Sequence, residues 1–273
     1  MDDLSSSFKR KMGECVKRKK ALITGATGGI GKEFADYFAK EGYALVLIGR
    51  NVEILMDIKT KLSKQHAEIT IWTISIDFAK AEEPEKLFDY VEKNCGEMDV
   101  VVNNAGFGYV GEFCQCPIQT TEDMIRVNID WVNRISYYYG KQMKERGEGM
   151  LINIASTGAY HPGPYTAVYY ATKAYVSSFS EAIARELKPY GVKVYSVCPG
   201  AVATDFSRRA GRRDNPAAMS PAYVVKETMK KVKRGKTVII PGWIYRVFVK
   251  IPRRIAGVLI GRQQKNMAFH IDK

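Results

Sequence analysis

Short apolar segments alternate with longer amphipathic segments along most of the chain. The apolar segments are predicted strands at 21–24, 44–49, 68–74, 99–103, 150–155, 192–197 and 237–240. Between them, apolar residues recur at the spacing of a helix face at 29–40, 52–66, 84–95, 120–145, 167–187 and 221–233. Apolar strands that alternate with helices are typical of a parallel sheet covered on both faces. The pattern predicts an α/β fold with a single Rossmann-type, doubly wound parallel sheet of about seven strands.

The charge distribution separates the two ends of the chain from its centre. The formal net charge is +13, with +4 in residues 1–20 and +14 in residues 207–273, which leaves −5 between them. We therefore divide the chain into a basic N-terminal arm at 1–19, a Rossmann-type domain at 20–240, and a basic amphipathic C-terminal extension of the same domain at 241–273. No DNA- or RNA-binding motif accompanies the basic residues, so no nucleic-acid partner is expected.

Composition also bears on the compartment. No run of about 18 apolar residues is present, and no apolar core follows the basic residues of the N-terminus. The five cysteines have neither disulfide-framework nor metal-knuckle spacing, since Cys114 and Cys116 are separated by one residue. We expect reduced thiols, no metal site, and a cytoplasmic protein.

A glycine-rich segment, TGATGGIG at 24–31, joins the first predicted strand to the first helix. Gly25 permits a tight turn, Gly29 lets the backbone approach a pyrophosphate, and Gly31 lets the helix pack closely on the strand. The phosphates then lie at the helix N-terminus, where free N–H groups favour anions. The predicted cofactor contacts here are Thr24, Gly25, Thr27, Gly29, Ile30 and Gly31. The alternative is a glycine turn with a purely structural role.

The ends of the second and third strands extend this prediction. Arg50 stands where NAD-specific enzymes place an acidic residue, and a guanidinium pairs well with a phosphate, which favours NADP(H) over NAD(H). The alternative is a surface arginine that caps the next helix. Asp77 can accept a hydrogen bond from an adenine amino group, or it can cap a turn.

Small residues follow two later strands. Asn104, Ala105 and Gly106 end the fourth strand and suit a ligand crevice, although a plain Asn/Gly turn is common. After the sixth strand comes a Pro-Gly-Ala-Val-Ala-Thr segment. Its backbone and hydroxyl groups can hold a carboxamide at the nicotinamide end. The predicted contacts there are Pro199, Gly200, Val202 and Thr204.

The candidate catalytic group is Ser156 with Tyr169 and Lys173. Residues four apart share a helix face, so Lys173 can lie beside the Tyr169 phenol. A nearby ammonium lowers a phenol pKa, and a tuned tyrosine can exchange a proton with a carbonyl oxygen. Ser156 ends a strand and can hydrogen-bond the same oxygen. A Y-x-x-x-K pair alone is more often incidental; by helical geometry Tyr170 is expected to point away from the site.

In this order, the motifs resemble the short-chain dehydrogenase/reductase family over residues 20–240. The resemblance implies a catalytic domain with Asn128, Ser156, Tyr169 and Lys173 as catalytic residues, Asn128 completing a proton relay through a water. It also implies that Tyr169 and Lys173 contact the cofactor. The segment 103–113, with Gly49 and Arg50, is similar to the NADP-linked branch that includes hydroxysteroid dehydrogenases and 3-ketoacyl reductases. Family members commonly pair long helices, which implies a homodimer or homotetramer.

These observations predict an NADP(H)-dependent oxidoreductase that moves a hydride between nicotinamide and a ketone or secondary alcohol. The alternative is a regulatory protein that binds NADP(H) without turnover. Aromatic and proline residues at 160–165 are expected to wall a site for a bulky lipophilic substrate. The extension 243–260 either lines that site, packs on a partner subunit, lies on a membrane surface, or docks on its own domain.

Overall fold

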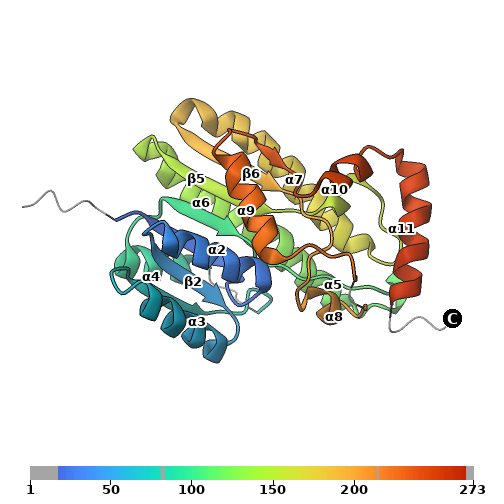
Figure 1. Ribbon diagram of the computed structural model, residues 1–273, viewed down its shortest axis with the longest axis horizontal. Coiled ribbons are helices and arrows are strands. Elements are labelled where there is room, and N and C mark those ends of the chain that lie inside the picture. The colour runs from blue at the N-terminus through green and yellow to red at the C-terminus, as the bar shows by residue number, and fades with distance from the viewer. Residues whose placement is uncertain (1–17, 81–83, 214, 269–273) are drawn as a thin grey trace, which may run out of the picture.

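The computed structural model describes residues 18–80, 84–213 and 215–268, so most of the predicted N-terminal arm lies outside the described residues. Its strands are β1 (Lys20–Thr24), β2 (Ala44–Gly49), β3 (Ile71–Ser75), β4 (Val100–Asn103), β5 (Gly149–Ile154), β6 (Val192–Val197) and β7 (Val238–Ile239). They form one sheet in the order β3-β2-β1-β4-β5-β6-β7, and every pair is parallel. The predicted fold class is confirmed (Figure 1).

The helices follow the predicted alternation. They are α2 (Gly29–Lys40), α3 (Val52–Gln65), α4 (Pro84–Cys95), α5 (Ile118–Ile125), α6 (Trp131–Arg146), α7 (Ala167–Leu187), α8 (Phe206–Arg209), α9 (Pro221–Val232), α10 (Trp243–Phe248) and α11 (Arg253–Met267). Three short 3₁₀ turns lie at Phe113–Gln115, Thr157–Tyr160 and Lys188–Tyr190.

The sheet is buried on both faces because successive strand residues point to opposite sides. Leu45 and Leu47 of β2 pack in the core that α2, α3 and α9 cover. Val46 and Ile48 of the same strand pack in the core of the other face, under α4, α6 and α7. A strand with apolar residues at every position therefore satisfies both cores at once.

Two predicted elements differ from the structure. The third strand begins at Ile71 and not at 68, because the preceding residues turn, with the Ile69 N–H bonded to the His66 carbonyl. The predicted helix at 120–145 begins at Ile118 and is interrupted by a π-helical turn at Arg126–Asp130. Such turns often occur at functional sites, and this one carries the predicted catalytic Asn128.

The chain order places a crevice at the centre of the sheet. From β1 the chain continues to β2 and β3 on one side, and it then returns to β4 on the other side of β1. The crevice at such a reversal, beyond the carboxyl ends of the strands, is where open parallel sheets bind ligands. Helices α8 and α11 lie together toward the side to which the β2 arrow points (Figure 1). The C-terminal extension forms two helices, and Pro252 stands between them.

Candidate active site

A cavity of about 380 Å³ opens at this crevice. The predicted site residues that line it are Gly25, Thr27, Gly29, Ile30, Arg50, Asp77, Asn104, Ala105, Gly106, Ser156, Tyr169, Lys173, Pro199, Gly200, Val202 and Thr204. Thr24, Gly31 and Asn128 are behind this lining. The topology thus brings the ends of six strands, far apart in sequence, to one cavity.

Thr24 and Asn104 fasten the end of β1 to the end of β4. The Thr24 hydroxyl accepts hydrogen bonds from the backbone N–H groups of Asn104 and Ala105, both at 3.0 Å. In return, the Asn104 side-chain amide donates to the carbonyls of Thr24 and Gly25, also at 3.0 Å. Thr24 is buried, so its contacts position the glycine loop and not the cavity surface.

The glycine loop is built for close backbone approach. Gly25 has φ +63°, and a Cβ on Gly31 would lie 2.3 Å from the Gly25 carbonyl oxygen, so neither position accommodates a side chain. A Cβ on Gly29 would lie 2.5 Å from the Thr204 methyl carbon. No side chain caps the N-terminus of α2, so its first N–H groups can donate hydrogen bonds to phosphate oxygens. The loop therefore fits a dinucleotide pyrophosphate.

The far end of the cavity fits a phosphorylated ribose and an adenine. Asn51, and not Arg50, caps helix α3, because its side chain accepts from the Ile54 N–H at 2.9 Å. The Arg50 side chain is exposed at the cavity edge and has no hydrogen bond or ion pair among the described residues. One Asp77 oxygen accepts from the Ala79 N–H at 3.1 Å, so this residue caps its turn and also borders the cavity.

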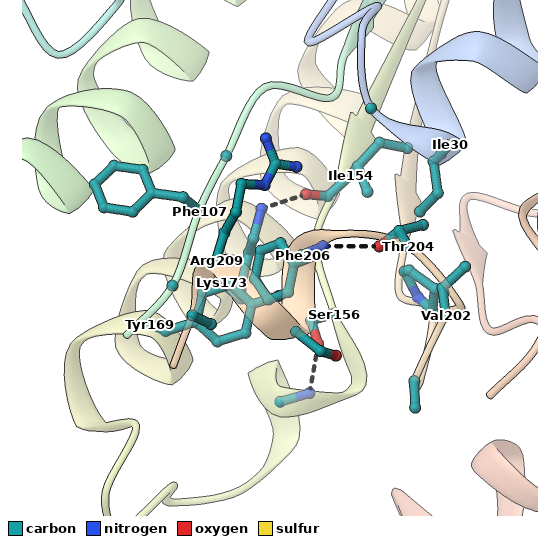
Figure 2. Close-up of a pocket in the computed structure, with 18 of the residues that line it drawn as sticks. Ile30, Phe107, Ile154, Ser156, Tyr169, Lys173, Val202, Thr204, Phe206 and Arg209 are labelled. Carbon is teal, nitrogen blue, oxygen red and sulfur yellow. Dashed lines mark hydrogen bonds between the residues drawn. The ribbon is translucent and has the colours of Figure 1, made fainter. Parts of the chain in front are cut away.

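Ser156, Tyr169 and Lys173 meet at the opposite end (Figure 2). Ser156 follows the end of β5, and its hydroxyl accepts from the Gly158 N–H at 3.1 Å. The same hydroxyl lies near enough to the Tyr169 phenol to lower its pKa. Lys173, one turn along α7, donates from Nζ to the Ile154 carbonyl at 2.8 Å. The three side chains come from one strand end and one helix. Among the residues that the structure describes, no group of three or more His, Cys, Asp or Glu side chains could hold a metal ion.

Burial controls the acidity of this group. It raises the pKa of Tyr169 to about 12, against opposing effects of the Ser156 hydrogen bond and the Arg212 charge. Burial also lowers the pKa of Lys173 to about 8. The sequence predicts that Lys173 lowers the Tyr169 pKa, but Lys173 is not among the groups that shift it. The Lys173 ammonium is hydrogen-bonded to the Ile154 carbonyl and lies 5.9 Å from the centre of the Tyr169 ring.

Asn128 lies beneath the cavity, fully buried in the π turn. Its Oδ1 accepts from the Phe107 N–H at 3.1 Å, and its Nδ2 donates to the Phe107 carbonyl at 2.9 Å and the Thr172 hydroxyl at 3.0 Å. A Cβ on Gly106 would lie 3.0 Å from Asn128 Oδ1 and 3.3 Å from Lys173 Nζ. Asn128 thus ties the loop after β4 to helix α7.

Two expectations about the substrate end are wrong. Tyr170 lines the cavity, because the chain on the far side of α7 folds back over it. Residues 160–165 do not line the cavity but support the C-terminal helices. The His161 ring is within 3.2 Å of the Phe248 carbonyl, and Pro162 packs where a Cβ on Gly257 would lie.

The substrate end instead contains side chains that sequence motifs did not indicate. Phe206 of α8 lies against the Tyr169 ring, with ring centres 5.3 Å apart. The Tyr245 hydroxyl of α10 accepts from the Ala201 N–H at 3.1 Å, and Phe248 also faces the cavity. From α11 come Ile260, Gln263 and Gln264. Only the aromatic and aliphatic pattern of the extension could have indicated these contacts.

Comparisons with known proteins agree with this geometry. The short chain dehydrogenase family profile matches residues 19–215. A very-long-chain 3-oxoacyl-CoA reductase of Phaeosphaeria nodorum is 32% identical over 79% of this chain and 63% of its own length. A short-chain dehydrogenase from Sphingobium yanoikuyae in complex with NADPH has 26% identity and a TM-score of 0.78, over 90% of this chain and 94% of that one. A bulky-bulky ketone specific alcohol dehydrogenase from Comamonas testosteroni has 26% identity and a TM-score of 0.74, over 90% and 92%.

The chain therefore belongs to the short-chain dehydrogenase family, and the predicted family is confirmed. The alignment with the Phaeosphaeria protein covers somewhat less than two thirds of that protein.

Proposed function

We propose that this protein is an NADP(H)-dependent ketoreductase acting on bulky lipophilic ketones, with 3-oxoacyl chains as the favoured class. The observation that carries the proposal is the convergence of Ser156, Tyr169 and Lys173 opposite an apolar wall from α8 and α10 in one cavity. The relatives named 3-oxoacyl-CoA reductases and the NADPH complex support this class of substrate and cofactor.

Bound NADPH supplies the hydride for the carbonyl carbon. Tyr169, whose pKa lies well above neutral pH, is protonated and gives its phenolic proton to the ketone oxygen. Ser156 donates a hydrogen bond to the same oxygen and stabilises the negative charge that develops there. Lys173 is the residue that would hold the nicotinamide ribose, and Asn128 keeps the loop at Gly106 against the catalytic helix. The glycine loop at 24–31 would hold the cofactor pyrophosphate, and Arg50 and Asp77 would hold the phosphorylated ribose and the adenine.

The direct test is NADPH oxidation with a series of 3-oxoacyl-CoA thioesters and a matched series of steroid ketones. We expect kcat/KM to rise with acyl length, because each buried CH₂ contributes about 0.8 kcal/mol. Steroid ketones turned over with the higher kcat/KM would contradict the acyl preference but keep the reaction class. A protein that binds NADPH and reduces neither series would support the alternative, a non-catalytic NADP(H)-binding regulator.

A membrane-surface role for the C-terminal extension is a second part of the proposal. Helix α10 exposes Trp243 and Val247, and α11 exposes Ile255, Val258 and Leu259. Basic residues accompany them, namely Arg246, Lys250, Arg253, Arg254 and Arg262. Exposed apolar side chains among cations suit the headgroup region of an anionic membrane. Within the described ranges, no helix is both long and apolar enough to cross a bilayer.

Sedimentation with anionic vesicles tests this surface. We expect vesicle binding that decreases with salt. The double variant Trp243→Ser, Val247→Ser should bind more weakly. Phe113 is exposed and distant in sequence, so the control Phe113→Ser should bind like the wild type. Unchanged binding of the double variant would show that another surface binds the vesicles and would refute the role of these helices. No binding by the wild type at low salt would refute the membrane role altogether.

We also propose a homodimer or homotetramer formed through the α5–α6 and α7 faces. Ile118, Ile125 and Tyr137 are exposed on α5 and α6, and Tyr175 is exposed on α7. Light scattering at micromolar concentration should give a mass of two or four chains, and Tyr137→Glu should lower it. The control Tyr90→Glu, on α4, should not. A monomeric wild type would overturn the assignment.

A further inference from the structure

The cavity carries more positive charge than the proposed reaction uses. Among the described residues of its lining, Asp77 is the one carboxylate, and the cations are Arg50, Lys173, Arg209 and Arg212. Arg50 is assigned to the cofactor phosphate and Lys173 to the catalytic group. Arg209 is exposed, whereas Arg212 is partly buried and closer to the catalytic tyrosine's environment.

Arg212 is held firmly through its backbone. Its N–H donates to the Ser207 carbonyl at 3.1 Å, and the residue forms an antiparallel bridge with Ala268, just after α11. Its guanidinium is less well satisfied. Nη1 is 3.4 Å from the Gln264 Oε1, and the buried Nε has no hydrogen-bond partner in the described part of the chain.

Arg212 lines the same cavity as Tyr169 and Tyr170. Its charge lowers the pKa values of both Tyr169 and Tyr170 against the effect of burial, which places it near both phenols. Gln264 lies near enough to the Tyr170 side chain to lower the pKa of its phenol, and the ring centres of Tyr169 and Tyr170 are 6.1 Å apart. Arg212 and Gln264 therefore border the catalytic tyrosine from the side of α8 and α11, away from the glycine loop.

We propose that Arg212, supported by Gln264, binds a second acceptor oxygen of the substrate, a few atoms from the reacting ketone. The inference rests on the proposed ketoreductase function and deepens it, since it selects 1,3-dicarbonyl substrates such as 3-oxo esters and thioesters over isolated ketones. Arg212 lines the cavity, and its terminal Nη groups carry more donors than the single contact with Gln264 uses, so an acceptor oxygen of the substrate can pair with them. The fork of donors also fixes the orientation of a planar ester or thioester group.

The test uses a 3-oxo ester and the matched ketone in which an alkyl group replaces the ester. The variants are Arg212→Gln and Arg212→Lys, with the adjacent exposed Arg213→Gln, which does not line the cavity, as the control. We expect Arg212→Gln to lower kcat/KM for the 3-oxo ester roughly 10- to 100-fold. The plain ketone should stay within about threefold, Arg212→Lys should recover part of the loss, and NADPH affinity should not change.

Each other outcome has a distinct meaning. An equal loss on both ketones, with a shift of the pH–rate profile, would overturn the proposal and assign Arg212 to tuning Tyr169. No loss on either would also overturn it. If the wild type reduces neither ketone, the proposed function fails. The binding role of Arg212 is then tested by the shift in melting temperature that the 3-oxo ester produces in the NADPH-loaded protein. Loss of this shift in Arg212→Gln but not in Arg213→Gln supports the binding role of Arg212. Retention of the shift in Arg212→Gln overturns that role.

Discussion

The glycine loop and the C-terminal helices border the same cavity but are built in different ways. The loop depends on backbone approach, with Gly25, Gly31 and Asn104 joined by contacts that no larger residue can replace. The wall from α8, α10 and α11 depends on long side chains such as Tyr245 and Gln264. The first region suits a ligand held by main-chain groups, whereas the ligand that the second region accepts depends on its side chains.

This difference separates cofactor from substrate in the chain. Residues 25–106 supply the proposed phosphate and adenine contacts, and residues 206–264 supply most of the substrate wall. Tyr169 and Lys173, the proposed catalytic residues, lie on α7, which touches both regions. Variants in one region should therefore change one ligand's binding and leave the other's intact.

The largest effect is expected at the junction of the two regions. Tyr169→Phe removes the proposed proton donor but keeps the ring, so turnover should fall by about 10²–10⁴-fold with NADPH affinity nearly unchanged. Steady-state kinetics and NADPH titration measure the two quantities. Tyr170→Phe is the matched variant, and because Tyr170 lines the cavity it should raise KM with little change in kcat. Retained turnover in Tyr169→Phe would show that another group donates the proton.

In the cofactor region, Arg50→Asp should weaken NADPH binding roughly 10- to 100-fold, because it replaces the candidate phosphate partner with a like charge. NADH should improve relative to NADPH, while KM for the ketone stays the same. Binding titrations with both cofactors check this, with Lys59→Asp on the neighbouring helix as the control. Equal use of both cofactors by the wild type would contradict the role of Arg50.

In the C-terminal wall, Phe248→Leu should raise KM for a bulky ketone about three- to tenfold through lost apolar contact. NADPH affinity should not respond. Ile255→Ala is the control, because that residue is exposed and does not line the cavity. If Phe248→Leu weakens NADPH instead, the division of the cavity into two independent regions is incorrect.

The smallest effect concerns pH and Lys173. Its pKa falls from 10.5 to about 8 through burial, so the unfolded chain binds the proton more tightly than the folded one. Deprotonation of Lys173 therefore favours the folded chain. The gain in stability is complete above pH 10.5 and is lost as the pH falls to about 8. Without cofactor, Lys173→Met should therefore be most stable relative to wild type at about pH 7 and lose that advantage by about pH 10. Thermal unfolding of both proteins at the two pH values measures it, and a constant difference would show that Lys173 has an ordinary pKa.

The sequence by itself determined the sheet and the residues at its carboxyl edge. Strands such as 44–49 are apolar throughout, and that pattern in alternation with helices is typical of a doubly covered parallel sheet. The motif from Thr24 to Gly31 follows from local needs of a turn and a helix start, so it is readable without a partner. The spacing of Tyr169 and Lys173 on one helix is equally local.

Only the tertiary structure decided which side chains close the cavity and how the lysine is held. Helices α10 and α11 follow the last strand with no motif, and their docking depends on packing against residues 160–165, which the sequence suggested as the wall itself. Tyr170 reaches the cavity because α11 covers it, and Arg212 comes near Tyr169 because its backbone pairs with Ala268. Lys173 donates to the Ile154 carbonyl because α7 packs over the end of β5. Such contacts join residues distant in sequence, and local periodicity carries no record of them.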